Sequence, residues 1–173
     1  KQQVSQNNNY IIEYIKINLQ EENMIIDYQK LEQETVEMLE NNKIWVLSTS
    51  FIDKITSRSM SIVHMGMDIY FQTNKKYTKY IQMTKNPNVT LCTGNISIEG
   101  TAQEIGSWKD EKNKDIMELY KSKHLSSYNR YGDLDGQVVF KITPKKVSYW
   151  KYSSVDGEQY REIFSVDRKM AER

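Results

Sequence analysis

The sequence predicts a mainly β fold with inserted helices (α+β), built on a small antiparallel β-barrel that is closed or partly split. One observation is a series of short apolar runs of strand length separated by turn residues, which gives six or seven strands joined largely by hairpins. The other is that helical periodicities stand before or between these strands, without the regular alternation of parallel doubly wound units. A barrel this small is filled by its own side chains, so we expect a ligand to bind outside it or at an interface.

Length and charge indicate one domain and exclude several classes of function. A chain of 173 residues is long enough to bury a core without disulfides or metals. With 24 basic and 23 acidic residues, the formal charge of +1 gives no field that argues for nucleic acid or an anionic membrane. No apolar run approaches the roughly 20 residues that a membrane span requires. We therefore expect a cytoplasmic protein that binds neither nucleic acid nor membrane.

Residues that form disulfides or bind metals are few. Cys92 is the single cysteine, which excludes an internal disulfide and fits a reducing compartment. The two histidines, His64 and His124, form no metal-ligand spacing, so we expect no metal. Cys92 has the pattern of a buried strand residue and not that of a reactive thiol.

The predicted domain organisation begins with an N-terminal extension over residues 1–27. Its apolar residues recur at helical spacing within 10–19 and predict a short amphipathic helix, lying on the domain or on a second subunit. The barrel domain is expected over residues 28–152. It opens with a second helix over residues 28–41, which ends at Asn41-Asn42.

The first predicted strand is residues 43–50 (KIWVLSTS), and residues 51–56 form its hairpin connection to the next strand. Residues 57–63 alternate small polar with apolar side chains, and residues 69–71 supply the β-branched and aromatic content of a partner strand. Gly66 between them offers a turn, so we expect these two strands to pair with each other.

Cationic side chains gather where this strand pair gives way to a helix, which runs from Lys75 to a stop at Asn86-Pro87. The residues at this junction are Arg58, Thr73, Lys75, Lys76 and Lys79. Free helix N–H groups, the helix dipole and ammonium groups all favour an anion, and a guanidinium can hold two phosphate oxygens. We therefore predict a phosphate site at the barrel rim, although lysines at a helix start are more often a solvated face.

The second half of the barrel is predicted from two more strands over residues 88–93 and 95–105. They are joined at Gly94-Asn95, where both residues tolerate positive φ. Gly100 indicates a bulge or a close backbone approach within the second strand.

A charged helix is expected over residues 108–121, followed by a polar loop with scattered tyrosines over residues 122–136. Residues 137–143 and 146–152 predict a last long strand, broken or bulged at Pro144. Residues 153–173 are expected as a C-terminal tail.

The order and spacing of these residues resemble the FMN-binding split-barrel family related to pyridoxamine 5'-phosphate oxidase, in its general stress protein branch. The resemblance covers about residues 31–152. The matching pieces are KIWVLSTS, Arg58-Ser59-Met60-Ser61-Ile62, Gln72-Thr73-Asn74, Lys79, Asn86-Pro87, and KITPKKVSYW with its Trp150.

The resemblance implies a six-stranded antiparallel split barrel of the FMN-binding type that forms a two-fold dimer. FMN would lie at the subunit interface, because half the cover of its flat ring has to come from elsewhere. Arg58 and Lys79 would bind the phosphate, and Lys75 or Lys76 would compensate for Thr78, which stands where the oxidases have a second phosphate-binding arginine. The other implied contacts are Ser59, Met60, Gln72 and Thr73 at the ring or ribityl chain, and Asn95, Trp150 and Arg161 from the partner subunit, which the C-terminal tail would also contact.

The implied function is an FMN-binding oxidoreductase that passes electrons from a reduced nicotinamide or similar donor to a small-molecule acceptor. One alternative is a non-catalytic flavin-binding stress-response protein that acts as a carrier or sensor. Another is a flavin-free dimeric barrel that handles a different ligand such as haem, which Thr78 favours. Oxidation of pyridoxamine phosphate itself is disfavoured, because residues 118–132 (ELYKSKHLSSYNRYG) do not reproduce the Tyr, Arg and Ser set that binds substrate phosphate in the oxidases.

Two residues keep open readings. His64, at a strand end, is the one candidate catalytic residue, although a lone histidine is more often structural. Trp150 either stacks on the flavin or packs the barrel end.

Overall fold

The structure is a computed structural model that describes residues 13, 15, 16 and 28–172. The predicted amphipathic helix at 10–19 lies, apart from three residues, outside this part of the chain. Residues 28–41 form a helix, as predicted. Its buried face carries Leu31 and Leu39, and the ring of Tyr28 meets Phe164 edge-on with ring centroids 5.5 Å apart.

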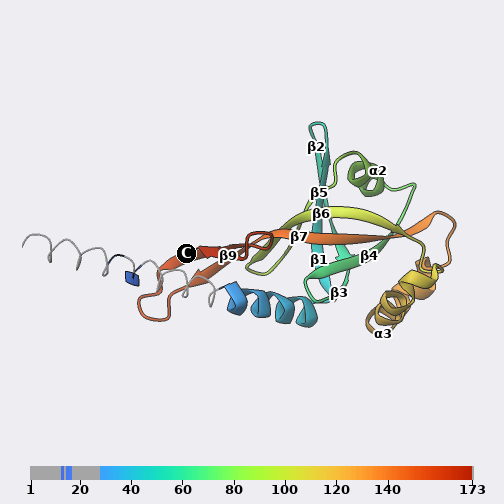
Figure 1. Cartoon of the computed structure of the whole chain (residues 1–173). Helices are drawn as coiled ribbons and strands as arrows, with labels where there is room; N and C mark the ends of the chain where they lie inside the picture. The colour runs from blue at the N-terminus through green and yellow to red at the C-terminus, as the bar shows by residue number, and fades with distance from the viewer. Residues whose placement is uncertain (1–12, 14, 17–27, 173) are drawn as a thin grey trace, which may run out of the picture.

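Residues 28–172 fold into one mainly antiparallel sheet of nine strands with three α-helices (Figure 1). The strands are β1 (Ile44–Phe51), β2 (Lys54–Ser61), β3 (Val63–Met65), β4 (Asp68–Asn74), β5 (Asn88–Thr93), β6 (Ile96–Gly106), β7 (Gln137–Tyr152), β8 (Gln159–Ser165) and β9 (Met170–Glu172). The sheet order is β2-β1-β5-β6-β7-β4-β3, with β8 added to β7 and β9 to β8. The predicted mainly β antiparallel fold with inserted helices is therefore confirmed. The expected count of six or seven strands is too low for the described residues, which form nine.

The main core fills the inside of this curled sheet. Alternate residues of β1 point inward, so Trp45 and Leu47 are fully buried while their neighbours Ile44 and Val46 stay exposed. A second cluster lies under α3 (Lys114–Tyr131) and joins Trp108, Ile116, Tyr120 and Val139 to β3 and β4. The space between the first cluster and this helix is where the candidate site lies.

The predicted pairing of residues 57–63 with residues 69–71 is wrong for most of its length. β2 pairs with β1, and only the short β3 pairs with β4 across the turn at Gly66, which has φ +58°. The chain changes partner at Ile62, whose N–H donates to Lys43 O and whose carbonyl accepts from His124 Nε2. Arg58 therefore lies on an edge strand of the sheet.

The β5–β6 hairpin is confirmed, with Gly94 at φ +52°, although Asn95 does not take positive φ. The irregularity predicted at Gly100 is also present. The β6–β7 register shifts between Glu99 and Gly100, and a Cβ on Gly100 would lie 2.6 Å from Thr143 O. Pro144 lies opposite this bulge without breaking β7.

The predicted loop at 122–136 is wrong, because α3 continues to Tyr131. The helix is kinked at His124, which has φ −138° and ψ 45°. His124 is buried, and desolvation lowers the pKa of its imidazole. α2 (Thr78–Lys85) ends at Asn86 before Pro87, as predicted, but begins three residues later than expected.

Residues 153–173, expected as a tail, contain the strands β8 and β9. Phe164 of β8 is fully buried in the main core. Lys151 of β7 also contacts both Glu34 of the first described helix, at 2.6 Å, and Glu162 of β8, at 2.7 Å. The end of the chain thus packs on the domain, and its expected contact with a partner subunit stays a prediction.

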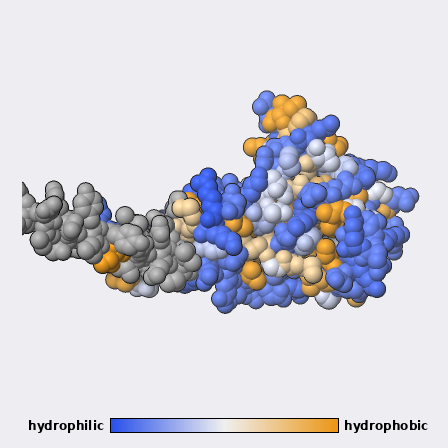
Figure 2. All heavy atoms as spheres, in the orientation of Figure 1, coloured by the Kyte–Doolittle hydropathy of each residue, from blue (hydrophilic) through white to orange (hydrophobic). Residues whose placement is uncertain are grey.

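The β1–β2 hairpin protrudes from the domain with an apolar tip (Figures 1 and 2). Ile52 is 80% exposed and has φ +53°, which is rare for a β-branched residue. Phe51 and Ile55 beside it are also exposed. Within the described residues, no helix is long and apolar enough to cross a membrane.

Candidate functional site

Arg58 is held on the inner face of β2 by three neighbouring oxygens. Its Nη1 donates to Leu47 O over 3.1 Å and to Thr49 Oγ1 over 2.8 Å, and its Nη2 donates to Thr56 Oγ1. These partners lie on the paired strands β1 and β2, so the antiparallel ladder itself aims the guanidinium. Burial lowers the pKa of Arg58.

Gln82 of α2 orients the two threonines that hold Arg58. Its Oε1 accepts from Thr49 Oγ1 over 2.6 Å and from Thr56 Oγ1 over 2.7 Å, while its Nε2 donates to Lys54 O over 2.9 Å. Because both hydroxyl hydrogens go to Gln82, the hydroxyl oxygens present lone pairs to Arg58. This buried cluster connects α2 to the β1–β2 hairpin.

Lys79, in the first turn of α2, is the second cation of the site. Burial, and after it the positive charge of Arg58, lower the pKa of the Lys79 ammonium. Its Nζ lies 4.6 Å from the centroid of the Tyr77 ring. Within the described part of the chain, neither Arg58 nor Lys79 forms an ion pair with a carboxylate. Two neighbouring cations without a counter-ion favour an anionic ligand.

A pocket of about 280 Å³ lies beside Lys79, and the β2 residues that follow Arg58 line it. It is lined by Ser59, Met60 and Ser61 of β2, Gln72 and Thr73 of β4, Tyr77 and Lys79 around the start of α2, Tyr120, Ser127 and Tyr131 of α3, and Gln137 of β7. β2 pairs with β1 alone among the described strands, and β4 beyond Tyr70 pairs there with β7 alone. Two strand edges with free backbone groups therefore border the pocket, and such groups can pair with the polar edge of a ligand.

Two buried oxygens at this pocket lack a hydrogen-bond partner among the described residues: Thr73 Oγ1 and Gln137 Oε1. Gln137 lies opposite Asn74 in the β4–β7 ladder, next to Thr73. A buried polar atom without a partner costs about 1–3 kcal/mol, so most such atoms in folded proteins are paired. Both atoms would gain a partner from a polar ligand in the pocket.

Gln72, predicted to contact a cofactor, uses its amide groups within the protein. Its Oε1 accepts from Trp108 Nε1 over 2.8 Å. Its Nε2 faces Tyr120 OH at 3.4 Å and Ser127 O at 3.2 Å. Burial raises the pKa of Tyr120, and hydrogen bonds to Ser127, Gln72 and Ser61 act against that shift.

The structure brings together Arg58, Ser59, Met60, Gln72, Thr73 and Lys79 of the predicted site and places the other predicted residues elsewhere. Lys75 forms an ion pair with Glu104 at 3.2 Å and does not line the pocket. Asn95 and Trp150 hold each other by two hydrogen bonds, Asn95 Nδ2 to Trp150 O at 2.8 Å and Trp150 N–H to Asn95 O at 2.9 Å. They do not line this pocket either.

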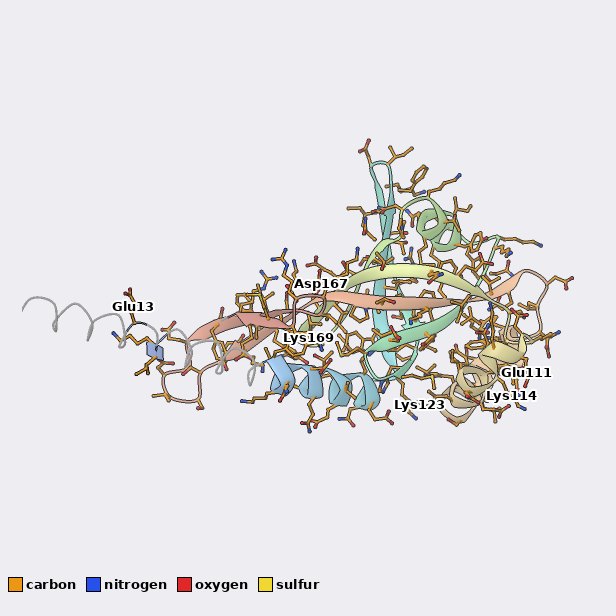
Figure 3. The ribbon with its side chains drawn as sticks, viewed as in Figure 1. Glu13, Glu111, Lys114, Lys123, Asp167 and Lys169 are labelled. Atoms are coloured by element: carbon orange, nitrogen blue, oxygen red, sulfur yellow. The ribbon has the colours of Figure 1, made fainter. Side chains whose placement is uncertain are left out.

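His64 lies outside the pocket, in a polar contact between three elements. Its Nε2 is 3.0 Å from Glu40 Oε2 of the first described helix, and its Nδ1 is 3.0 Å from Gly66 O. Lys123 of α3, which is labelled in Figure 3, reaches the same Glu40 oxygen at 2.5 Å. The hydrogen bond from Lys123, followed by that from His64, lowers the pKa of Glu40. This arrangement joins elements and leaves His64 without contact to the site.

Gln82, Gln137, Trp108 and Ser127 are not predicted as site residues from the sequence. Gln82 and Gln137 belong to no motif, and only the folded structure brings them to the pocket. Tyr120, Tyr128 and Tyr131 are candidates for a substrate pocket from the sequence, although scattered tyrosines are common, and Tyr120 and Tyr131 do line the pocket. Extending the predicted helix of residues 108–121 would have placed Ser127 seven residues after Tyr120, on the same face.

Comparison with known proteins identifies the family of the chain. A sequence model of the family described as pyridoxamine 5'-phosphate oxidase matches residues 31–151. General stress protein 26 of Bacillus subtilis (strain 168) is 25% identical over 126 residues, which cover 70% of this chain and 89% of that protein.

Two solved structures share the fold. General stress protein 26 from Bacillus anthracis str. Sterne superposes with a TM-score of 0.55 at 24% identity, covering 76% of this chain and 98% of that one. A protein from Mesorhizobium loti described as FAD-binding gives a TM-score of 0.56 at 15% identity, covering 77% and 93%. The chain therefore belongs to the pyridoxamine 5'-phosphate oxidase family, in its branch similar to general stress protein 26.

Proposed function

We propose that the protein binds FMN in the pocket between β2, β4, α2 and α3, and that it acts as an oxidoreductase. The observation that carries the proposal is the pair Arg58 and Lys79, two partly desolvated cations without a carboxylate partner in the described residues. The FMN phosphate carries a charge near −2 and would neutralise both. Membership of a family that includes FMN oxidoreductases supports this assignment.

The rest of the pocket fits the other parts of FMN. The free backbone edge of Ser59, Met60 and Ser61 offers N–H and C=O groups to a pyrimidine edge, and Thr73 and Gln137 carry the buried oxygens that lack partners. When bound, FMN would supply the electron acceptor and donor that the protein's own side chains lack. Under this proposal, the curled sheet is a split barrel whose two open edges are β2 and β4.

The same proposal includes a homodimer with FMN at the subunit interface. The pocket volume of about 280 Å³ is at the lower limit for a cofactor site, so further cover from a second copy is needed. The outward face of β1 exposes Ile44 and Val46, opposite the small side chains of Ser61 and Ser59 on β2. Trp150 is 47% exposed and lies opposite Arg161 in the β7–β8 ladder, where both are available to a partner.

A non-catalytic flavin carrier or sensor is the second candidate. His64 is the one candidate catalytic acid or base predicted from the sequence. Its ring nitrogens contact Glu40 and Gly66 and not the pocket, which favours a protein that binds flavin without catalysis. In this version the cofactor site is the same, but electrons are not passed on in turnover.

Two measurements test these proposals in sequence. Purified protein should carry a flavin, shown by its visible absorbance band and by phosphate analysis of the released cofactor. Anaerobic addition of NADH or NADPH should then bleach the band, and an added acceptor should restore it repeatedly. Flavin binding without bleaching would favour the carrier, and protein that takes up no FMN would refute both versions.

A further inference from the structure

Four side chains, of which all but Trp108 line the pocket, form one hydrogen-bond chain: Trp108, Gln72, Tyr120 and Ser127. Trp108 Nε1–H donates to Gln72 Oε1 over 2.8 Å, and both residues are buried. Because an indole N–H can only donate, this bond fixes the orientation of the Gln72 amide. The carbonyl of Gln72 faces Trp108, and its amino group faces α3.

The amino group of Gln72 meets only oxygens on α3. Its Nε2 lies 3.4 Å from Tyr120 OH, 3.2 Å from Ser127 O and 3.3 Å from Ser127 Oγ. The amino group has two hydrogens for these three oxygens and can only donate. A hydroxyl oxygen that it reaches therefore accepts from it and keeps its own hydrogen.

The remaining hydroxyl hydrogens indicate what this hydrogen-bond chain can do. Tyr120 OH and Ser127 Oγ are 3.1 Å apart, and one hydrogen bond between them uses one of the two hydrogens. Ser61 of β2 also hydrogen-bonds Tyr120, so two hydrogen bonds join three hydroxyl groups and one of their three hydrogens is left for another group. Both residues line the pocket, so a ligand there can accept it.

The charged groups nearest on α3 are turned away from this wall. Lys121 pairs with Glu118 at 3.3 Å, and Lys123 pairs with Glu40 at 2.5 Å. His124 Nε2 forms a hydrogen bond with Ile62 O over 2.8 Å. Lys79 of α2 lines the same pocket, but the donors of this wall are neutral. Neutral donors favour a neutral oxygen acceptor over a carboxylate or phosphate, which loses more hydration on entering.

We propose that Tyr120 and Ser127 form a donor site for a neutral carbonyl-type or nitro oxygen on the molecule that occupies the pocket. Trp108 is a positioning residue that acts through Gln72. This inference rests on the proposed function, and the oxygen has two sources: a ring carbonyl of the flavin, or the reducible group of an electron-accepting substrate. The chemistry of recognition is the same for both.

Ligand-observed NMR titrations with nitrobenzene, benzoate and toluene test the site, because these molecules share a shape and differ in charge and acceptor oxygens. Nitrobenzene should bind the wild-type protein more tightly than toluene, and it should bind a Lys79→Ala variant, which lacks the lysine of the pocket, more tightly than benzoate. Tyr120→Phe and Ser127→Ala should each weaken nitrobenzene binding by roughly 2- to 12-fold, the range for one neutral hydrogen bond, and leave toluene binding unchanged. Trp108→Phe should weaken nitrobenzene binding by a similar factor, although Trp108 does not contact the ligand.

Tyr131→Phe is the matched control, since Tyr131 lines the same pocket outside the chain of four. The proposal is overturned if benzoate binds the Lys79→Ala variant as tightly as nitrobenzene does, or if Tyr131→Phe acts as strongly as Tyr120→Phe. Circular dichroism establishes that each variant folds. If Trp108→Phe does not fold, Tyr120→Phe and Ser127→Ala decide the result.

A further experiment with FMN distinguishes the two sources of the oxygen. If the oxygen belongs to the flavin, Tyr120→Phe and Ser127→Ala lower FMN affinity and nitrobenzene competes with FMN. If it belongs to a substrate, FMN affinity is unchanged and nitrobenzene binds the flavin-loaded protein. A protein that prefers nitrobenzene through Tyr120 but takes up no FMN would refute the proposed function and leave the donor site standing.

Discussion

Arg58 on β2 and Lys79 on α2 lie close enough for the charge of Arg58 to lower the pKa of the Lys79 ammonium. The two residues are 21 positions apart in the sequence, and the β1–β2 hairpin and the packing of Gln82 bring them together. Like charges repel, so placing these two cations together costs free energy that a favourable interaction must offset. An anion bound between them would provide it.

Replacing Arg58 by alanine should weaken FMN binding by about 10- to 150-fold. The loss corresponds to one charge-assisted contact of roughly 1.5–3 kcal/mol. Equilibrium dialysis with FMN measures it, and Lys85→Ala is the control because Lys85 is an exposed cation in the last turn of α2. Unchanged FMN affinity in Arg58→Ala would exclude the proposed phosphate site.

The pKa of Lys79 predicts opposite effects of pH on FMN affinity and on stability. Its folded pKa is below the ordinary lysine value, so the ammonium discharges as pH rises through that lowered pKa. FMN affinity should fall over this range. The contribution of Lys79 to the free energy of unfolding of the FMN-free protein should rise over the same range, because the unfolded chain then binds more protons than the folded protein.

Titrations of FMN affinity and of denaturant stability at alkaline pH check both trends. Lys79→Arg provides the comparison, since arginine keeps its charge throughout the range. Its FMN affinity should decline less steeply than that of the wild type. An equal decline would mean that another group titrates.

Gly100→Ala should reduce the free energy of unfolding by about 1–3 kcal/mol. The new Cβ would lie 2.6 Å from Thr143 O and 3.0 Å from Ile142 Cγ2, so the β6–β7 ladder must shift. Urea denaturation measures the change, with Ser97→Ala on the same strand as control. Equal stability of the two variants would show that the bulge adapts freely.

Phe164→Ala should reduce the free energy of unfolding by about 3–5 kcal/mol, as is usual for a buried phenylalanine. Phe164 is fully buried, and its ring contacts Tyr28 of the first described helix. A chain shortened to end at Tyr152 should be still less stable. Thermal unfolding compares the three proteins, and a shortened chain as stable as the full one would assign residues 153–173 to a dispensable tail.

Val46→Lys should convert the proposed dimer into a monomer and release FMN. Val46 is on the exposed face of β1, where a lysine is tolerated in the monomer but would be desolvated in a dimer. Sedimentation velocity and flavin absorbance of the same sample measure both effects. Val155→Lys is the control because Val155 is 93% exposed in the β7–β8 loop. A Val46→Lys monomer that keeps its flavin would refute a site shared between subunits.

Elements controlled by local sequence could be predicted. The helix at 28–41 and the end of α2 at Asn86 depend on periodicity and on proline, and the turn at Gly94 depends on glycine's access to positive φ. The cation pair was also predicted in part, because a strand arginine and a lysine at a helix start are visible in the sequence.

Features that depend on distant contacts could not be predicted. The exchange of partners at Ile62 requires the contacts of Lys43 and His124. The second half of α3 carries many serines and charges, and it is helical because Ser127 and Tyr120 meet Gln72. Gln82 and Gln137 became site residues only through the packing of α2 and β7.

The contacts of Gln82 have a consequence for how a ligand enters. Since its amide already engages Thr49 and Thr56, the Arg58 guanidinium is immobilised before any anion arrives. The ordering entropy of that long side chain is therefore lost during folding and not during association. The anion site is therefore preorganised, and binding should need little rearrangement of the protein.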